Sequence, residues 1–447
     1  MILNNQFLFV VICLSFLGGA FVIHSLSFSY IYIQKILIIS IVLLGLVSRM
    51  RLSILSLKFG IFLILYLLFA LISSFLLSKN IVYSLASIQS LLTIVLTYLW
   101  VSSMNFNYAQ LRKFRSLAYL IIVVQIFFSL YKYSFYGINE QWFIGTMSHS
   151  AGQLSLLFPA IAIPLVFFLM KREVKLMSYI LVFFLFLFAI IGEKRAAVFI
   201  LPIIILASYI FILSDELKPK NVSNKFVLFA ILFGLVSLGI YLISSLNSLQ
   251  VERGNVNYLY IFEYAWNYLN MSCVDDLYYE TLQGLCSDMD TVRNIHYGRF
   301  KLTLLAFDLV FSSDIKTLLF GLGYGAVTPS ELLGNSRDIL YEVTRLRGSL
   351  SGFCHALIET GLFGAGLISS FFLIIFIKLK IGIKKLKSKN AVKWYKMLMV
   401  ILGVFCFDFF FYSTVLFRAM PLPIIFGGLL ASIIIVKKID QNNPGSI

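Results

Sequence analysis

Apolar runs of about 20 residues recur along the whole chain, separated by short polar segments. That length is what an α-helix needs to cross a bilayer. The runs are apolar throughout and do not alternate with polar positions, which excludes an outer-membrane barrel. We therefore predict an all-α polytopic membrane protein with about 12 transmembrane helices, over residues 7–23, 31–48, 59–77, 81–101, 116–132, 153–170, 176–192, 196–213, 226–243, 353–377, 397–416 and 419–436.

One long polar segment interrupts this pattern. It covers residues 244–352, about 110 positions, which is too long for a simple connector. The chain thus divides into helices one to nine (1–243), this segment, and helices ten to twelve with a tail (353–447). Within the segment, residues 256–270 and 297–311 have apolar positions at helical spacing, so we expect short helices there.

The first run has no basic residues before it and no clear small-residue cleavage site. We expect it to remain as a helix and not to be removed as a signal peptide.

The net charge of +16 follows from the topology. If the N-terminus is cytoplasmic, the inner loops hold 22 Lys and Arg against 4 Asp and Glu, and the outer side holds 14 against 16. Basic residues gather in cytoplasmic loops of membrane proteins. We therefore predict that both termini are cytoplasmic and that the long segment is periplasmic. Nucleic acid is not needed as a partner to explain the charge.

Motifs of soluble enzymes are missing from the sequence. There is no P-loop, HExxH or CxxC, so we expect neither ATP hydrolysis nor a metal, and no other cofactor is indicated. The glycine-rich stretch 321–325 lacks the spacing of a dinucleotide fingerprint. It is either a tight turn that returns the long segment to the membrane or, around Gly323, a backbone cradle for phosphate or sugar.

The start of the tenth predicted helix carries His355 and, one turn later, Glu359. This spacing places both on one helix face. His355 alone is often a polar residue at the interface, but a carboxylate inside an apolar helix is usually functional. Together they suit a general base with an orienting acid. Gly361, Gly364 and Gly366 follow, and small residues at this spacing let helices approach closely.

Basic residues on the predicted outer side require an explanation, because Lys and Arg usually gather in the cytoplasmic loops. Lys194 and Arg195 follow Glu193 between helices seven and eight. They either pair with Glu193 to cap a hairpin or grip a lipid-linked phosphate, for which a guanidinium is well shaped. More outer positive charge comes from Arg299, Arg345 and Arg347.

The remaining polar residues receive structural interpretations. Asp408 and Arg418 frame the last hairpin and are expected to pair, and His149 is expected to be a solvated loop residue. Cys273 and Cys286 lie in the long segment. If that segment faces an oxidising periplasm we expect a disulfide between them; otherwise they are two unrelated thiols.

Taken in order, four motifs of this chain resemble those of the O-antigen ligase/polymerase superfamily of bacterial envelope glycosyltransferases. They cover roughly residues 140–370: a glycine-led loop at 145–153, the turn Glu193–Ala196, Gly298–Arg299 with Gly321–Gly323, and the helix start His355–Gly364. Ala356 stands where ligases usually have Asn, and Lys194 stands where the family usually has a small residue.

The resemblance implies a GT-C-like glycosyltransferase that uses no metal or nucleotide. Its donor would be an oligosaccharide on undecaprenyl pyrophosphate at the inner membrane, with membrane lipids, a chain-length regulator and the flippase as further partners. Arg195 and Arg299 would hold pyrophosphate, and His355 would activate the acceptor hydroxyl. The missing Asn favours an O-antigen polymerase over a ligase. A flippase is a third alternative, but transporters usually place polar sites near the midplane in two related halves.

Overall fold

The computed structural model describes residues 54–77, 81–104, 106, 108–136, 145, 154–169, 175–191, 195–213, 299–327, 350–412 and 421–442, together with scattered positions in 8–16, 38–47 and 234–241. Every regular element of this described part is a helix, as predicted. The elements are α3 (Ile54–Leu77), α4 (Ile81–Ser103), α5 (Tyr108–Tyr136), α6 (Leu154–Leu169), α7 (Lys175–Ile191), α8 (Arg195–Leu213), α12 (Arg299–Phe311), α13 (Ile315–Phe320), α15 (Gly352–Lys385), α16 (Lys389–Phe407), the π-helix η3 (Asp408–Tyr412) and α17 (Leu422–Asn442).

Six stretches of the described helices are long and apolar enough to cross a membrane: Gly60–Leu77, Ser116–Phe135, Ala196–Leu213, Gly352–Lys385, Lys389–Tyr412 and Leu422–Asn442. Ser87–Ser103, Leu154–Leu169 and Leu176–Ile190 are shorter apolar helices. The chain is therefore an α-helical polytopic membrane protein. Half or more of each predicted helix at 7–23, 31–48 and 226–243 lies outside the described residues, so the count of 12 stays a prediction.

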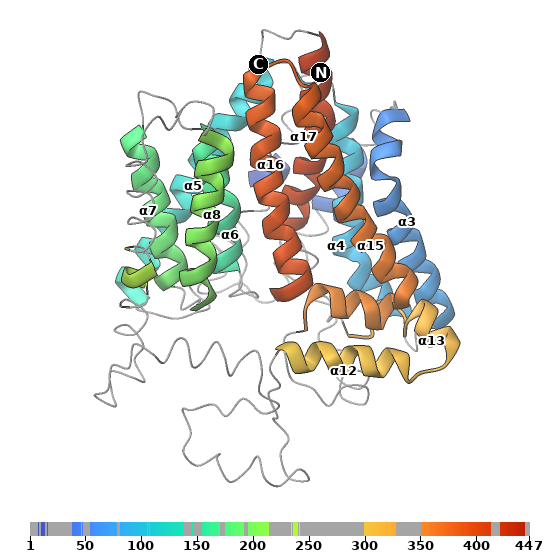
Figure 1. Cartoon of the computed structure of the whole chain (residues 1–447). Coiled ribbons are helices and arrows are strands. Elements are labelled where there is room, and N and C mark those ends of the chain that lie inside the picture. The colour runs from blue at the N-terminus through green and yellow to red at the C-terminus, as the bar shows by residue number, and fades with distance from the viewer. Residues whose placement is uncertain are drawn as a thin grey trace, which may run out of the picture.

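The helices stand side by side in two groups (Figure 1). α5, α6, α7 and α8 form one group, and α3, α4, α15, α16 and α17 form the other. Contacts of α16 with α6 and α8 join the two groups. α12 and α13 lie across one end of the assembly, where α15 begins (Figure 1). The prediction of a helix within 297–311 is thereby confirmed.

Side-chain exposure agrees with helices that face lipid. On α3 and α15, large apolar side chains such as Phe75, Phe363 and Leu373 are more than half exposed. Large aromatic side chains such as Trp100 and Tyr98 of α4 are buried inside. α4 and α17 also pack closely, and a Cβ on Gly427 would lie 2.7 Å from the carbonyl oxygen of Ile94. Glycine at this position allows the two backbones to touch.

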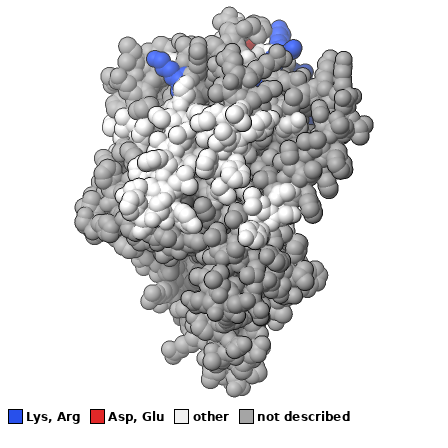
Figure 2. All heavy atoms as spheres, turned by 90° about the vertical axis from the view of Figure 1, so that its left-hand side faces the viewer, with Lys and Arg blue, Asp and Glu red and all other residues white. Residues whose placement is uncertain are grey.

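The opposite end of the assembly carries many of the lysines. α15 ends with Lys384 and Lys385, and its connection to α16 is held by Asp440 of α17. The Asp440 carboxylate accepts hydrogen bonds from the backbone N–H groups of Lys387 (2.9 Å) and Ser388 (2.8 Å). Figure 2 shows the described Lys and Arg of one face gathered at this end, above an area of described residues that carries no charge. The site residues lie at the other end.

Candidate functional site

The candidate site is formed where α15 begins. Ser351 caps the helix, and its Oγ accepts a hydrogen bond from the backbone N–H of Cys354 at 3.3 Å. The cap fixes the first turn and so the backbone position of His355. Both predicted catalytic side chains are buried here: His355 is 7% exposed and Glu359 is 1% exposed. They occupy the first and second turns of α15.

α15 is not the continuous helix that the apolar run predicts. At Gly361 the backbone turns to φ 61° and ψ −165°, which breaks the helix just after Glu359. A Cβ on Gly361 would lie 2.5 Å from the backbone of Leu319. Reciprocally, a Cβ on Gly321, whose φ is 76°, would lie 2.4 Å from the backbone of Glu359. Two glycines with left-handed backbones therefore let α15 and the end of α13 pack backbone against backbone.

The glycine-rich loop after α13 is bound to α15 through its backbone. The N–H groups of Leu322 and Gly323 donate to the carbonyls of Ile358 (2.8 Å) and Glu359 (3.0 Å). The remaining N–H groups of residues 321–327 also donate within the protein. Gly321 donates to the Thr317 carbonyl, Tyr324 to Ser74 Oγ, and Ala326 to the Gly323 carbonyl. Gly325 and Val327 both donate to Glu359 Oε1. A phosphate cradle needs free N–H groups. The structure therefore favours the tight turn over the cradle interpretation for Gly323.

Glu359 joins this loop with its side chain as well as its backbone. Its Oε1 accepts hydrogen bonds from the N–H groups of Gly325 at 3.2 Å and Val327 at 3.0 Å. Hydrogen bonds to a carboxylate are stronger than those between neutral groups. The predicted orienting acid thus also fastens the loop beside the helix start, a role that the sequence does not reveal.

α3 supports the same junction from the side. Ser73 Oγ donates to the carbonyls of Phe320 (2.7 Å) and Glu359 (3.2 Å), and Ser74 Oγ accepts from the N–H of Tyr324 (3.2 Å). The side chain of Tyr66 is hydrogen-bonded to that of Thr360. The only sequence signal for these residues is that they are polar within an apolar helix. They hold the start of α15, the loop and α3 as one unit.

α12 and η3 complete the surroundings of the helix start. Thr303 of α12 contacts the Cys354 thiol at 3.7 Å, and the ring of Phe353 packs on Phe307 (6.1 Å) and Phe410 (5.6 Å). Asp408, the first residue of η3, is fully buried. π-helical turns are rare and are frequent at functional sites.

Asp314 links α12 to α13 and lies outside the membrane-spanning helices. Its side chain caps α13 by accepting from the N–H of Thr317. Hydrogen bonds from Thr317 lower the pKa of this exposed carboxyl, so the cap is ionised in neutral solution.

Comparison with models of protein families and with curated proteins finds no match to this chain. The assignment of activity therefore rests on the residues and their arrangement.

The structure brings together His355, Glu359 and Gly323 of the predicted site. Arg195 is the first residue of α8 and Arg299 is the first of α12, one turn before Thr303; their side chains lie outside the described part. Also outside the described residues are Lys194, Arg345, Arg347, Cys273, Cys286, His149 and Arg418.

Several helices begin or finish at the end of the assembly where His355 lies, which is called the site end. α3 reaches it with Ser73, so α4 starts there and runs away from it. α5 returns to it, α6 leaves, α7 returns, and α8 begins there with Arg195. Arg195, Arg299 and His355 thus belong to the same end of the molecule.

The sequence analysis gave no role to Lys132, the last residue of the predicted helix 116–132. The structure places Lys132 inside α5, with only 5% of its surface exposed. Its Nζ donates to the carbonyl oxygen of Gly145 at 2.5 Å. Burying an ammonium group costs several kcal/mol unless a partner of opposite charge compensates it. The available sequence signal was a single lysine near the end of an apolar run.

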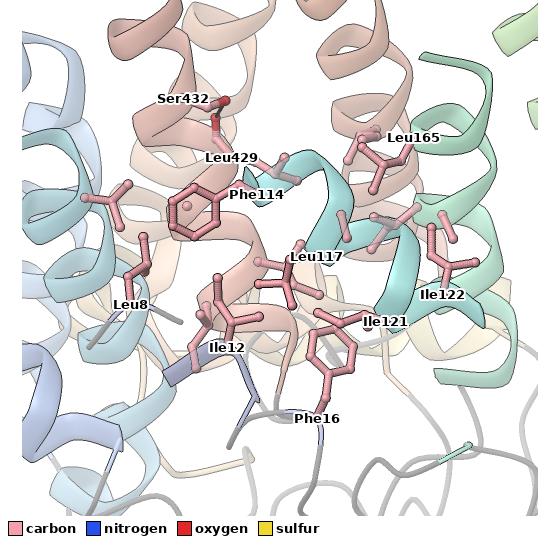
Figure 3. A pocket seen from close by; sticks show the side chains of 18 of the residues that line it. Leu8, Ile12, Phe16, Phe114, Leu117, Ile121, Ile122, Leu165, Leu429 and Ser432 are labelled. Atoms are coloured by element: carbon pink, nitrogen blue, oxygen red, sulfur yellow. Dashed lines mark hydrogen bonds between the residues drawn. The ribbon is translucent and has the colours of Figure 1, made fainter. Parts of the chain in front are cut away.

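Two apolar cavities lie between the helices, away from His355. One, of about 250 Å³, is enclosed by α4, α5, α6, α16 and α17 and by side chains near the N-terminus, including Leu8 and Phe16 (Figure 3). Thr97 and Ser432 are its polar lining residues, and the Ser432 hydroxyl accepts a hydrogen bond from the indole N–H of Trp394 at 3.0 Å. The other, of about 330 Å³, lies between α6, α8, α15 and α16. Both suit hydrocarbon better than a sugar.

Proposed function

We propose that this protein is an O-antigen polymerase, or the polymerase of a related surface polysaccharide. It joins oligosaccharide repeat units that are linked to undecaprenyl pyrophosphate. It is a multi-pass protein of the bacterial inner membrane with both termini in the cytoplasm and the site at the periplasmic face. The long segment 244–352 belongs to that face.

The observation that carries the proposal is the buried pair His355 and Glu359 at a fixed helix start. Catalytic groups work best when the fold holds them in place before substrate arrives. The N-cap, the break at Gly361 and the loop bonds to Glu359 supply that rigidity. The order of motifs along the chain then favours this superfamily over other membrane enzymes.

The chemistry needs a base on the acceptor and positive charge on the donor. An imidazole nitrogen of His355 takes the proton of the acceptor hydroxyl, and the oxygen attacks the anomeric carbon of the donor. The bond from that carbon to the phosphate oxygen breaks, and undecaprenyl pyrophosphate leaves with the electron pair. Arg195 and Arg299 stabilise its charge, and Lys194, Arg345 and Arg347 are further candidates for this role.

The second candidate is the O-antigen ligase, which moves a finished chain onto lipid A core. Ala356 in place of Asn after His355 favours the polymerase. A flippase fits less well, because His355, Glu359 and the starts of α8 and α12 gather at one end of the assembly. Transporters place their polar sites near the middle of the membrane.

Deletion of the gene tests the proposal through the lipopolysaccharide pattern on a gel. Loss of a polymerase leaves core that carries a single repeat unit. Loss of a ligase instead leaves bare core together with chains on the lipid carrier, and loss of a flippase leaves core without any repeat unit and no periplasmic chains. An unchanged ladder in the deletion strain would show that the protein has another function.

A further inference from the structure

Lys132 lies on a polar face of an otherwise apolar helix. Gln125, Ser129 and Lys132 are spaced i, i+4 and i+7 along α5, so they share one side of it. All three are buried, at 1%, 4% and 5% exposure. This part of α5 lies within the membrane-spanning stretch Ser116–Phe135. Ionisable residues in such stretches usually serve a function.

The chain after α5 folds back onto this face. Gly145 has φ 59°, and a Cβ there would lie 2.0 Å from the Gln125 side-chain oxygen. Only glycine allows the backbone to come so close, and its carbonyl oxygen then receives the Lys132 ammonium. Gly145 also begins the stretch that resembles the glycine-led loop of the superfamily.

The Lys132 ammonium has three donors, and the Gly145 carbonyl uses one of them. The acceptor that it meets among the described residues is a neutral carbonyl, which does not compensate the positive charge. A buried ammonium with further N–H donors suits a phosphate oxygen, which offers both charge and several acceptors.

We propose that Lys132 is the centre of an anion-binding site for a phosphate group of a membrane lipid, at the outer end of α5. α5 ends at the same end of the molecule as α8 and α12 begin, so the ligand lies on the side of His355. The ligand would be the undecaprenyl pyrophosphate donor, and this part of the inference rests on the proposed function. The phosphate of a phosphatidylglycerol headgroup has the same chemistry and is the other source.

The test uses the full-length protein in phosphatidylcholine nanodiscs and measures the binding of undecaprenyl pyrophosphate and, separately, of phosphatidylglycerol. Lys132→Gln keeps a donor for Gly145 but loses the charge, Lys132→Met loses both, and Lys132→Arg keeps both. Lys113→Gln, an exposed lysine near the other end of α5, is the matched control. Monodisperse elution and an unchanged circular dichroism spectrum confirm that each variant is folded.

We expect Lys132→Gln and Lys132→Met to bind at least about tenfold more weakly, since a hydrogen bond to a charged group is lost. Lys132→Arg and Lys113→Gln should bind like the wild type. Weakened undecaprenyl pyrophosphate binding assigns the site to the donor. A loss confined to phosphatidylglycerol assigns it to the headgroup. Wild-type affinity for both lipids in Lys132→Gln overturns the site.

The same measurements separate this inference from the proposed function. If the wild type binds undecaprenyl pyrophosphate but does not join repeat units, and Lys132→Gln binds more weakly, the polymerase proposal fails and the anion site stands. If the wild type polymerises and Lys132→Gln binds and polymerises equally well, the anion site alone fails.

Discussion

The Oε1 atom of Glu359 accepts a hydrogen bond at 3.0 Å from the backbone N–H of Val327, 32 residues earlier in the chain. This bond joins the second turn of α15 to the end of the glycine-rich loop. The carboxylate expected to orient His355 therefore also closes the loop beside it. Structural and catalytic roles of Glu359 can be separated by the choice of substitution.

We predict different outcomes for Glu359→Ala and Glu359→Gln. Alanine leaves the N–H groups of Gly325 and Val327 without their acceptor, which should lower the free energy of unfolding by about 1–3 kcal/mol for each buried group. Glutamine keeps a side-chain oxygen and should be close to wild type in stability, while polymer formation falls because the charge is lost. Thermal unfolding of the purified protein and the polysaccharide ladder measure the two effects. An alanine variant as stable as the wild type would contradict the structural role.

The glycines of the backbone contact give a second prediction. Gly361→Ala and Gly321→Ala should each sharply reduce folded protein, because a left-handed backbone disfavours alanine by about 1–2 kcal/mol and the added Cβ also meets backbone atoms. Gly366→Ala is the control, since open space surrounds that position. The amount of monodisperse protein after detergent extraction is the measurement. Equal yields from all three variants would show that the backbone contact is not needed.

His355→Gln tests the general base. Glutamine keeps polarity and size but cannot take the acceptor proton, so chain formation should fall by about 10²–10⁴-fold. The level of membrane-inserted protein should remain normal, which an immunoblot checks. Long chains in normal amount would make His355 a binding or structural residue, and Glu359 would become the next candidate for the base.

Arg195→Lys and Arg299→Lys test the grip on pyrophosphate. Lysine keeps the charge but loses the planar fork that binds two phosphate oxygens at once. Each variant should polymerise poorly while the protein level stays normal. Lys384→Gln, at the opposite end of α15, is the control and should leave the ladder unchanged. Full activity in both arginine variants would support the ion-pair interpretation instead.

Reporter fusions test the orientation. Fusions after Arg115, Lys175, Lys220 and Lys389 should report the cytoplasm, and a fusion near Cys286 should report the periplasm. The basis is the excess of basic residues in the predicted inner loops. A cytoplasmic signal near Cys286 would place the site on the wrong side for this chemistry and would exclude the proposed function.

The positions of several described helices could be read from the sequence within about five residues, whereas α5 begins earlier (108 against 116) and α15 ends later (385 against 377) than predicted. The runs at 59–77, 81–101 and 196–213 correspond to α3, α4 and α8. The prediction succeeds because a backbone in lipid must satisfy its hydrogen bonds within the protein. A long apolar run that crosses the bilayer therefore forms a helix. The pair His355 and Glu359 was predictable for a similar reason, since its spacing is local.

Other features depend on contacts between distant segments. The break at Gly361 falls inside a run that predicts one continuous helix, and Gly366, expected to allow close helix approach, instead faces open space. Whether a glycine in such a run bends the chain depends on what packs against it. Here that is the backbone of Leu319, more than 40 positions earlier.

By itself, the sequence determined that this chain is a bundle of membrane helices, and it pointed to the helix start at His355. Bilayer-length hydrophobicity and i, i+4 spacing are local properties, so both could be read directly. Only the tertiary structure decided that Glu359 fastens the loop through Gly325 and Val327, and that Lys132 is buried against Gly145. Those partners are chosen by packing between segments, because a buried polar group must find a partner wherever the fold provides one.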